Sequence, residues 1–278
     1  MPAAIRLLAG ILLARNAVCA AETAVRSVPA YSAASIVNSA TNLPGPLAPN
    51  TIASLYGQDL ASGTRAVSAN DLNGGSLPTV LPGTGVTVSI GGIAARLYYV
   101  SPTQINFLVP ADLRPGKAPF QVRLETKNGP EIDIQIAATA PGFYQLGPAS
   151  PVCTLADGTV ISPARPAQPG DVVIIYGTGF GQTTPPAPPG RLAITPDSIV
   201  RPQDAEVRLA GVPLGRSNLF YIGVTPGFAG LYQVNLRIPD DTPDDPELAI
   251  SIAGVESPTL KLPVRRPDPA ATLSVPVR

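Results

Sequence analysis

Residues 171–181, DVVIIYGTGFG, are a run of β-branched residues that ends in a Tyr-Gly-x-Gly-Phe turn, and the chain contains an earlier version of this run. Four segments of the first half return in the second half, in the same order. They are residues 55–60 (LYGQDL) with 175–180 (IYGTGF), 88–92 (VSIGG) with 207–211 (VRLAG), 98–100 (YYV) with 220–222 (FYI), and 104–110 (QINFLVP) with 233–239 (QVNLRIP). Matches that keep their order indicate two tandem copies of one fold.

Composition favours an all-β fold for both copies. The 278 residues include 34 prolines and 26 glycines, which end helices and suit short strands joined by turns. Alternating apolar residues predict strands in both halves, and no amphipathic helix is predicted. The expected strands are residues 51–56, 86–90, 94–100, 120–124 and 132–136, and then 171–176, 207–209, 219–222, 232–238 and 248–252. Short strands at this spacing predict two tandem immunoglobulin-like β-sandwiches.

The repeat and the turn signals divide the chain into six parts. Residues 1–20 are typical of a secretory signal peptide, with Arg6, a short apolar run and a small-residue cleavage site at 18–20. The alternative is an ordinary amphipathic segment, because Arg15 interrupts the apolar run. The other predicted parts are a lead-in segment (21–48), the first sandwich (49–145), a bridging segment (146–168), the second sandwich (169–266) and a C-terminal tail (267–278).

Charge and histidine content exclude several functions. The 19 basic residues balance the 19 acidic ones, so the chain lacks the basic excess on which nucleic-acid binding depends. Histidine is absent, which excludes a Ser-His-Asp or Cys-His nucleophile and any histidine-ligated metal. After residue 20 no segment has the ~18 apolar residues of a membrane span. Removal of the signal leaves Cys153 as the one thiol, which we expect to be a buried hydrophobe rather than a reactive group.

Several motifs also resemble a known family. Residues 169–181 resemble the opening of IPT/TIG-type immunoglobulin-like domains. The chain as a whole, over residues 35 to 265, resembles the "Solibacter uncharacterized C-terminal domain" family of secreted acidobacterial proteins. The matching segments are 37–40 (VNSA), 101–107 (SPTQINF), 109–110 (VP), 140–143 (APGF), 176–181 (YGTGFG) and 227–235 (GFAGLYQVN). The resemblance implies secretion and an immunoglobulin-like fold, but no chemistry.

The candidate ligand-binding residues are amides and tyrosines. Gln104 and Asn106, and in the second copy Gln233 and Asn235, alternate with apolar residues, so each pair shares one face of a strand. Such amides could bind sugar hydroxyls, but the favoured alternative is that they satisfy backbone groups. Tyr98 and Tyr99 could stack on a glycan or a partner, together with Phe220, Tyr221, Phe228 and Tyr232. Alternation predicts that one residue of each adjacent aromatic pair points into the core.

Carboxylates give no clear site. Residues 239–247, PDDTPDDPE, could hold Ca²⁺ in a loop, but a solvated turn is favoured over a metal site. A glycosidase would need two carboxylates that meet in space. The sequence singles out no pair among Asp59, Asp71, Asp112, Glu125, Glu131, Asp133, Asp157 and Asp171. We therefore expect no catalytic, metal or cofactor site.

These observations together favour a non-catalytic extracellular or cell-surface module for binding, adhesion or spacing. The expected partner is a cell-surface polysaccharide or another extracellular protein, recognised by the exposed loops at residues 61–82 and 183–190. The alternatives are a secreted hydrolase with a carboxylate pair between the two domains, and a structural unit that assembles through exposed sheet edges. The oligomeric state does not follow from the sequence.

Overall fold

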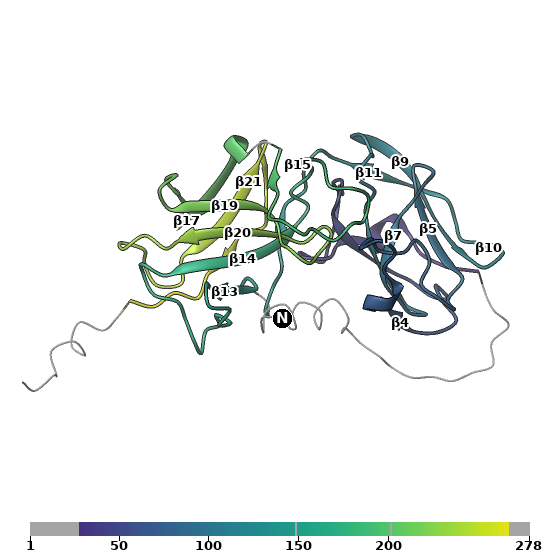
Figure 1. Ribbon diagram of the computed structural model, residues 1–278, viewed down its shortest axis with the longest axis horizontal. Coiled ribbons are helices and arrows are strands. Elements are labelled where there is room, and N and C mark those ends of the chain that lie inside the picture. The colour runs from purple at the N-terminus through teal and green to yellow at the C-terminus, as the bar shows by residue number, and fades with distance from the viewer. Residues whose placement is uncertain (1–27, 148, 201, 267–278) are drawn as a thin grey trace, which may run out of the picture.

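The computed structural model describes residues 28–147, 149–200 and 202–266 and shows two β-sandwiches side by side (Figure 1). The predicted signal peptide and the C-terminal tail lie outside the described residues. Within the described ranges the helical elements are three short 3₁₀ turns: η1 (Ala33–Ser35), η2 (Ala69–Asp71) and η3 (Pro202–Asp204). The prediction of an all-β fold of two tandem β-sandwiches is confirmed.

The first sandwich has a sheet of six strands and a sheet of five. In spatial order, the larger sheet contains β2 (Leu43–Pro44), β1 (Ile36–Asn38), β3 (Ile52–Tyr56), β8 (Gln104–Leu108), β7 (Arg96–Val100) and β4 (Arg65–Ala66). The smaller sheet contains β10 (Lys127–Asn128), β9 (Gly116–Leu124), β5 (Val86–Ile90) and β6 (Ile93–Ala94), and β11 (Ile132–Ile136) also pairs with β9.

The second sandwich has sheets of seven and five strands. In spatial order, the larger sheet contains β12 (Gly142–Phe143), β14 (Val172–Thr178), β20 (Tyr232–Arg237), β19 (Leu219–Val224), β16 (Ser198–Ile199) and β15 (Thr183–Thr184), and β13 (Cys153–Leu155) also pairs with β14. The smaller sheet contains β18 (Val212–Pro213), β17 (Ala205–Leu209), β21 (Glu247–Ile252) and β22 (Val255–Glu256), and β23 (Leu260–Lys261) also pairs with β21.

The two sandwiches share one strand order, as expected for a duplication. The central path β3-β8-β7-β4 of the first larger sheet corresponds to β14-β20-β19-β16 of the second. The path β6-β5-β9-β10 of the first smaller sheet corresponds to β18-β17-β21-β22, and β11 corresponds to β23. The lead-in segment supplies the strands β1 and β2, and the bridging segment supplies β13. These strands have two or three residues each, too few to show an alternating pattern.

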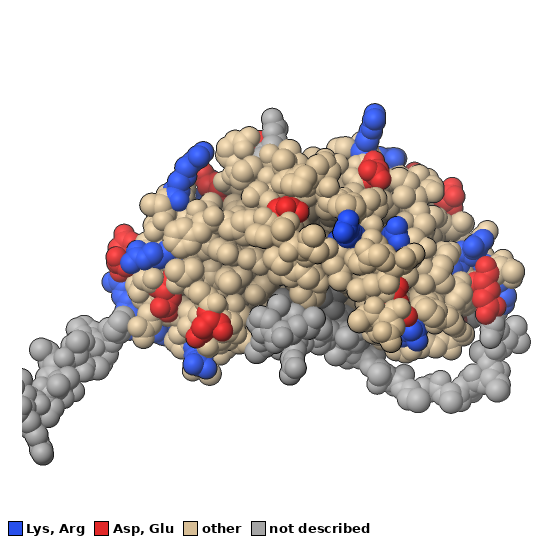
Figure 2. Space-filling view, in the orientation of Figure 1, with Lys and Arg blue, Asp and Glu red and all other residues tan. Residues whose placement is uncertain are grey.

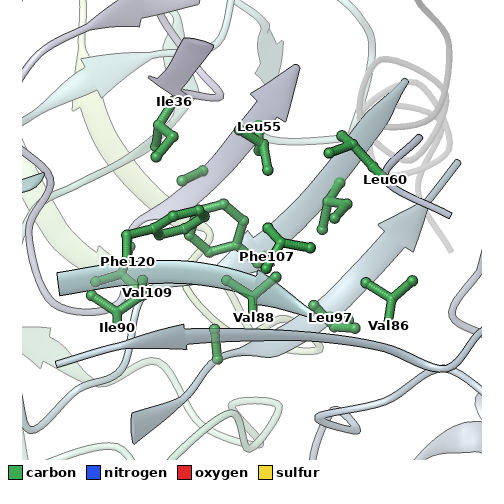
Figure 3. Close-up of a cluster of buried hydrophobic side chains, with 14 of the residues drawn as sticks. Ile36, Leu55, Leu60, Val86, Val88, Ile90, Leu97, Phe107, Val109 and Phe120 are labelled. Carbon is green, nitrogen blue, oxygen red and sulfur yellow. The ribbon is translucent and has the colours of Figure 1, made fainter. Parts of the chain in front are cut away.

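Each sandwich has its own apolar core. In the first, Phe107 and Phe120 face each other from opposite sheets with ring centroids 5.6 Å apart, and both are fully buried (Figure 3). In the second, the rings of Phe180 and Tyr232 lie 5.1 Å apart. Cys153 lies in the second core, as the sequence predicted, and burial raises the pKa of its thiol to about 12. A thiol with such a pKa stays protonated and unreactive at neutral pH.

A third apolar cluster joins the two sandwiches and is called here the junction core. Its buried members come from both halves: Ala40, Ile52, Leu77 and Leu108 from the first, and Tyr144, Val152, Tyr176, Ala229 and Leu231 from the segments that follow. Tyr144 is 1% exposed, and its hydroxyl lies 2.8 Å from the hydroxyl of Ser39. The junction therefore buries apolar area in the way that a domain interior does, and this burial opposes separation of the sandwiches.

The two loops that were expected to be free for recognition meet each other beside the junction core. The amide of Leu77 donates to the carbonyl of Gly190 (2.9 Å), and the amide of Leu192 donates to the carbonyl of Gly75 (2.9 Å). The guanidinium of Arg96 also donates to the carbonyl of Leu77 (2.7 Å). Parts of both loops therefore connect the sandwiches, an arrangement that depends on contacts between segments more than 100 residues apart.

Gly230 packs closely against the first sandwich. A Cβ atom at this position would collide with the Leu108 side chain and the Asn50 carbonyl oxygen. Gly230 also has φ +72°, a left-handed conformation that costs other residues about 1–2 kcal/mol. Only glycine satisfies both conditions, so residues 229–231 can pack directly on the first sandwich.

We expect Gly230→Ala to destabilise the protein more than Gly227→Ala. Gly227 has φ +89° with open space around it, so alanine there carries the conformational cost of roughly 1–2 kcal/mol and no collision. At Gly230 the collision adds roughly 1–3 kcal/mol. Urea unfolding of both variants measures the difference, and equal losses of stability would show that the close approach is unimportant.

Candidate functional site

In the first sandwich, the predicted amide pair is buried and bonded to its neighbours. The side chain of Gln104 donates to Asn106 Oδ1 (2.8 Å), and the Ser54 hydroxyl donates to the same oxygen (3.0 Å). Ser54 and Asn106 are opposite one another on β3 and β8, and Asn106 is 1% exposed. The structure therefore brings Gln104 and Asn106 together on one strand face, where the first amide donates to the second.

The amide pair of the second sandwich repeats this bond in a more open setting. Gln233 Nε2 donates to Asn235 Oδ1 (2.9 Å) on β20. Both residues are half-buried, and their cross-strand neighbours on β14 are Tyr176 and Ile174. This pair keeps amide surface that a ligand could reach, whereas Asn106 does not.

Tyr98 lies at a β-bulge and contacts the second sandwich. The register of β7 against β8 shifts between Leu97 and Tyr99, which leaves Tyr98 as the extra residue. Its hydroxyl donates to the carbonyl of Ala229 (2.5 Å) and accepts from the amide of the same residue (3.2 Å). Burial raises the pKa of the Tyr98 phenol above its ordinary value. Tyr98 thus joins the two sandwiches through both polar groups of one peptide residue.

The bulge corrects the expectation that one of Tyr98 and Tyr99 points into the sandwich core. The residues on either side, Leu97 and Val100, are fully buried in that core, whereas both tyrosines are half-buried outside it. An extra residue interrupts the period of two, so two adjacent side chains can leave the core together. Tyr99 lies beside Asn106 and Ala66 on the neighbouring strands.

Arginines neutralise the acidic run at 239–247. Arg237 pairs with Asp240 (2.8 Å), and Arg265 pairs with Asp245 (2.5 Å). The backbone amide of Arg266 donates to Asp244 Oδ1 (2.9 Å). Asp240, Asp244 and Asp245 thus pair with arginine side chains or a backbone amide. No group of three or more His, Cys, Asp or Glu side chains suited to a metal ion occurs among the described residues.

One of the candidate carboxylates, Asp71, forms an ion pair, and a small cavity at the junction is lined without carboxylates. The pKa of Asp71 is lowered by hydrogen bonds from Ser68 and by Arg65, with which it forms a 2.7 Å ion pair. The cavity between the sandwiches has a volume of about 10 Å³, at the lower limit for one water molecule. Its lining includes Asn50, Arg191 and Tyr232 and no carboxylate.

Charged side chains form no single patch on the face shown in Figure 2. Lysines and arginines lie singly or beside acidic residues, and uncharged surface separates them. Within the described ranges, no helix has the length and apolar character needed to cross a bilayer.

The polar residues that join the sandwiches were not predicted from the sequence. The Thr178 hydroxyl accepts from the amide of Ile52 (2.9 Å) and donates to the carbonyl of Gly230 (2.7 Å). Asn38 donates to the carbonyl of Ala140 (3.0 Å), and Thr139 donates to that of Ile252 (3.0 Å). The signal in the sequence for a contact between the domains is the Gly-Phe-Ala-Gly segment at 227–230, which has no counterpart in the first copy.

Comparisons with known proteins show distant similarities in structure. No family model and no curated protein matches the chain. A surface glycan-binding protein from Prevotella bryantii is 14% identical, with a TM-score of 0.26, over 85% of this chain and 42% of its own. A Bacteroides ovatus glycan-binding protein of a mixed-linkage glucan utilization locus, solved with a heptasaccharide, is 10% identical, with a TM-score of 0.32, over 80% of this chain and 43% of its own. The tandem immunoglobulin repeats of Dlar are 14% identical, with a TM-score of 0.22, over 80% of this chain and 94% of their own.

The chain thus spans less than half of each glycan-binding protein. At these TM-scores the similarities carry no argument about a ligand, and the function has to be argued from the residues of this chain.

We expect Tyr98→Phe to lower the free energy of unfolding by about 1–3 kcal/mol, because it leaves the amide and the carbonyl of Ala229 without a partner in the junction. Tyr99→Phe is the matched control, since the Tyr99 hydroxyl forms no hydrogen bond with the described residues. Chemical denaturation measures both variants. If the Tyr98→Phe and Tyr99→Phe proteins were equally stable, the Tyr98 hydroxyl would not stabilise the junction.

Proposed function

We propose that the protein is a non-catalytic extracellular binding module whose two sandwiches act as one rigid body. The observation that carries this proposal is the junction core, with the hydrogen bonds of Tyr98 and Thr178 that cross it. A flexible tether between two independent domains would need none of these contacts. A rigid body is useful to a binding or adhesion module because it fixes the distance between surfaces on the two domains.

Non-catalytic action is supported by the chemistry that the chain lacks. Without histidine, the common nucleophile–base systems are excluded, and Cys153 is buried with a raised pKa. An extracellular location rests on the expected signal peptide at residues 1–20 and on the resemblance to secreted proteins.

A polysaccharide is the ligand that the exposed chemistry fits best. Tyr99 on the first sandwich, and Gln233 with Asn235 on the second, combine an aromatic ring and amide groups on half-buried sheet faces. Aromatic rings stack on sugar faces, and amides bond to hydroxyls. Tyr98 and Asn106 are left out of the proposed ligand site and given a structural role, because their polar groups already have protein partners.

Rigidity is tested by the distance between two spin labels, one on each sandwich. Lys117 and Lys261 are exposed strand residues on different sandwiches, and Cys153 is too buried to label. In a Cys19→Ala background, Lys117→Cys with Lys261→Cys should give one narrow distance distribution. Gly230→Ala in the same background should broaden it. A broad distribution in the unaltered junction would contradict the proposal.

Ligand binding is tested by co-sedimentation with a panel of insoluble polysaccharides. We expect saturable binding to at least one of them, weakened at least about tenfold by the combination Tyr99→Ala with Gln233→Ala, because stacking and hydrogen bonds are both lost. Val212→Ala, on another edge of the second sandwich, is the control. Binding that is unchanged in the double variant would place the site elsewhere. If the protein bound none of the polysaccharides, the rigid body would be assigned a role as a spacer.

A further inference from the structure

The larger sheet of the second sandwich carries two adjacent aromatic rings outside its core. The register of β19 against β20 shifts between Leu219 and Tyr221, which leaves Phe220 as the extra residue. Leu219 and Ile222 pack in the second core, whereas Phe220 and Tyr221 are not part of it. Phe220 is 55% exposed, and Tyr221 is half-buried. The bulge therefore interrupts the period of two and leaves both rings on the outside of the sheet.

Gly223 gives the side chain of Tyr221 room to lie along β19. A Cβ atom at Gly223 would collide with the Tyr221 phenol oxygen and with the carbonyl oxygen of Asp197. The phenol hydroxyl is within hydrogen-bond distance of the carbonyl oxygens of Asp197 (2.9 Å) and Val224 (2.8 Å). The ring is therefore held in place without a ligand, and a ring that is already held loses little conformational entropy on binding.

Polar groups surround this ring on the same face of the sheet. Asn235 is opposite Tyr221 on β20, and Gln233 is opposite Gly223, while Ser198 on β16 is opposite Gly223 from the other side. Strands β19 and β20 lie side by side in Figure 1. Gln233 Nε2 donates to Asn235 Oδ1, but Gln233 Oε1, the Asn235 amino group and the Ser198 hydroxyl form no hydrogen bond within the described ranges. A donor, an acceptor and a hydroxyl are thus available beside the ring.

The first sandwich has the same motif but not the same site. The match of residues 98–100 with 220–222 puts Ser101 at the position of Gly223, so a side chain is present where Tyr221 has space. Gln104 and Asn106 are 8% and 1% exposed, whereas the equivalent amides of the second sandwich are half-buried. The ring with accessible amides on both sides is therefore a feature of the second sandwich.

The charges near the ring favour an uncharged ligand. Burial and the negative charge of Asp197 both raise the pKa of the Tyr221 phenol, which places this carboxylate close to the ring. Arg237 is the next residue on the same face of β20, and it is already paired with Asp240 (2.8 Å). A ligand on the ring therefore meets a negative charge beside an arginine that is already neutralised, and an anionic ligand would be repelled.

We propose that this face, called here the β19 platform (Ser198, Phe220, Tyr221, Gln233 and Asn235), binds an uncharged polysaccharide. The Tyr221 ring stacks on a sugar ring, and the two amides bond to its hydroxyls, which both donate and accept. The platform rests on the proposed function and narrows it in two ways. It restricts the ligand to uncharged polysaccharides, and it places the main contact on the second sandwich rather than at Tyr99.

Affinity electrophoresis of the full chain in native gels tests the platform. The uncharged probes are xylan, glucomannan and hydroxyethylcellulose, and the charged probes are polygalacturonate and alginate. We expect at least one uncharged probe to retard the protein. Tyr221→Ala and Asn235→Ala should each weaken this binding at least about tenfold, because stacking or hydrogen bonds are lost. Tyr99→Ala, at the equivalent position of the first sandwich, is the matched control and should weaken binding much less.

Thermal melting of each variant separates loss of binding from loss of the fold. Tyr221 is held by hydrogen bonds, so Tyr221→Ala could lower stability, whereas Asn235 lies outside the core and Asn235→Ala should melt as the parent does. Asp197→Asn tests the role of charge. It should keep binding to the uncharged probe and should reduce the preference for it over polygalacturonate at low salt.

The possible failures separate the platform from the proposed function. If no probe binds, the polysaccharide ligand and the platform both fall. If a probe binds and Asn235→Ala and Tyr221→Ala bind it as the parent does, or if Tyr99→Ala costs as much as Tyr221→Ala, the platform falls while a polysaccharide ligand stands. Equal binding of charged and uncharged probes by the parent would overturn the restriction to uncharged ligands.

Discussion

The hydroxyl of Thr178 is the interaction on which the arrangement of the two sandwiches depends. It accepts a hydrogen bond from Ile52 in the first sandwich and donates one to Gly230 in the second, and it is fully buried. A buried hydroxyl that keeps both bonds fixes three segments relative to one another, and the loss of either bond would leave a polar group unsatisfied. Gly230 must be a glycine for its carbonyl to come this close, and the same approach lets Ala229 reach Tyr98.

The sequence predicted the repeated parts of the fold well. Strands such as Val86–Ile90 alternate strictly between buried and half-buried residues, and ordered repeats predict a shared topology. Short edge strands such as Leu43–Pro44 could not be predicted, because two residues have no period. The bulges at Tyr98 and Phe220 were missed because both residues of each pair, Tyr98–Tyr99 and Phe220–Tyr221, are aromatic, and the sequence does not show where the period of two is interrupted.

The candidate site shows a different limit of sequence reasoning. The motif at Gln104 and Asn106 was correctly placed on one face of a strand, but its exposure depends on what packs above that face, and the local sequence does not contain this information. The loop at 183–190 looked free for the same reason, since its contacts lie more than 100 residues away. Residue types and spacings describe a strand, whereas the surface that remains accessible is a property of the assembled pair of domains.

The 227–230 segment makes the two copies of the duplication unequal. It occurs in the second copy alone, and its residues Ala229 and Gly230 contact Tyr98 and Leu108, the receiving surface of the first sandwich. A gene in which the order of the copies was reversed would still encode two complete sandwiches, each with its own core. In the resulting chain the receiving surface and the 227–230 segment would lie at opposite ends. The two domains would then lack the contacts that join them here. Sequence order, and not the fold of either copy, therefore makes a single body of this protein.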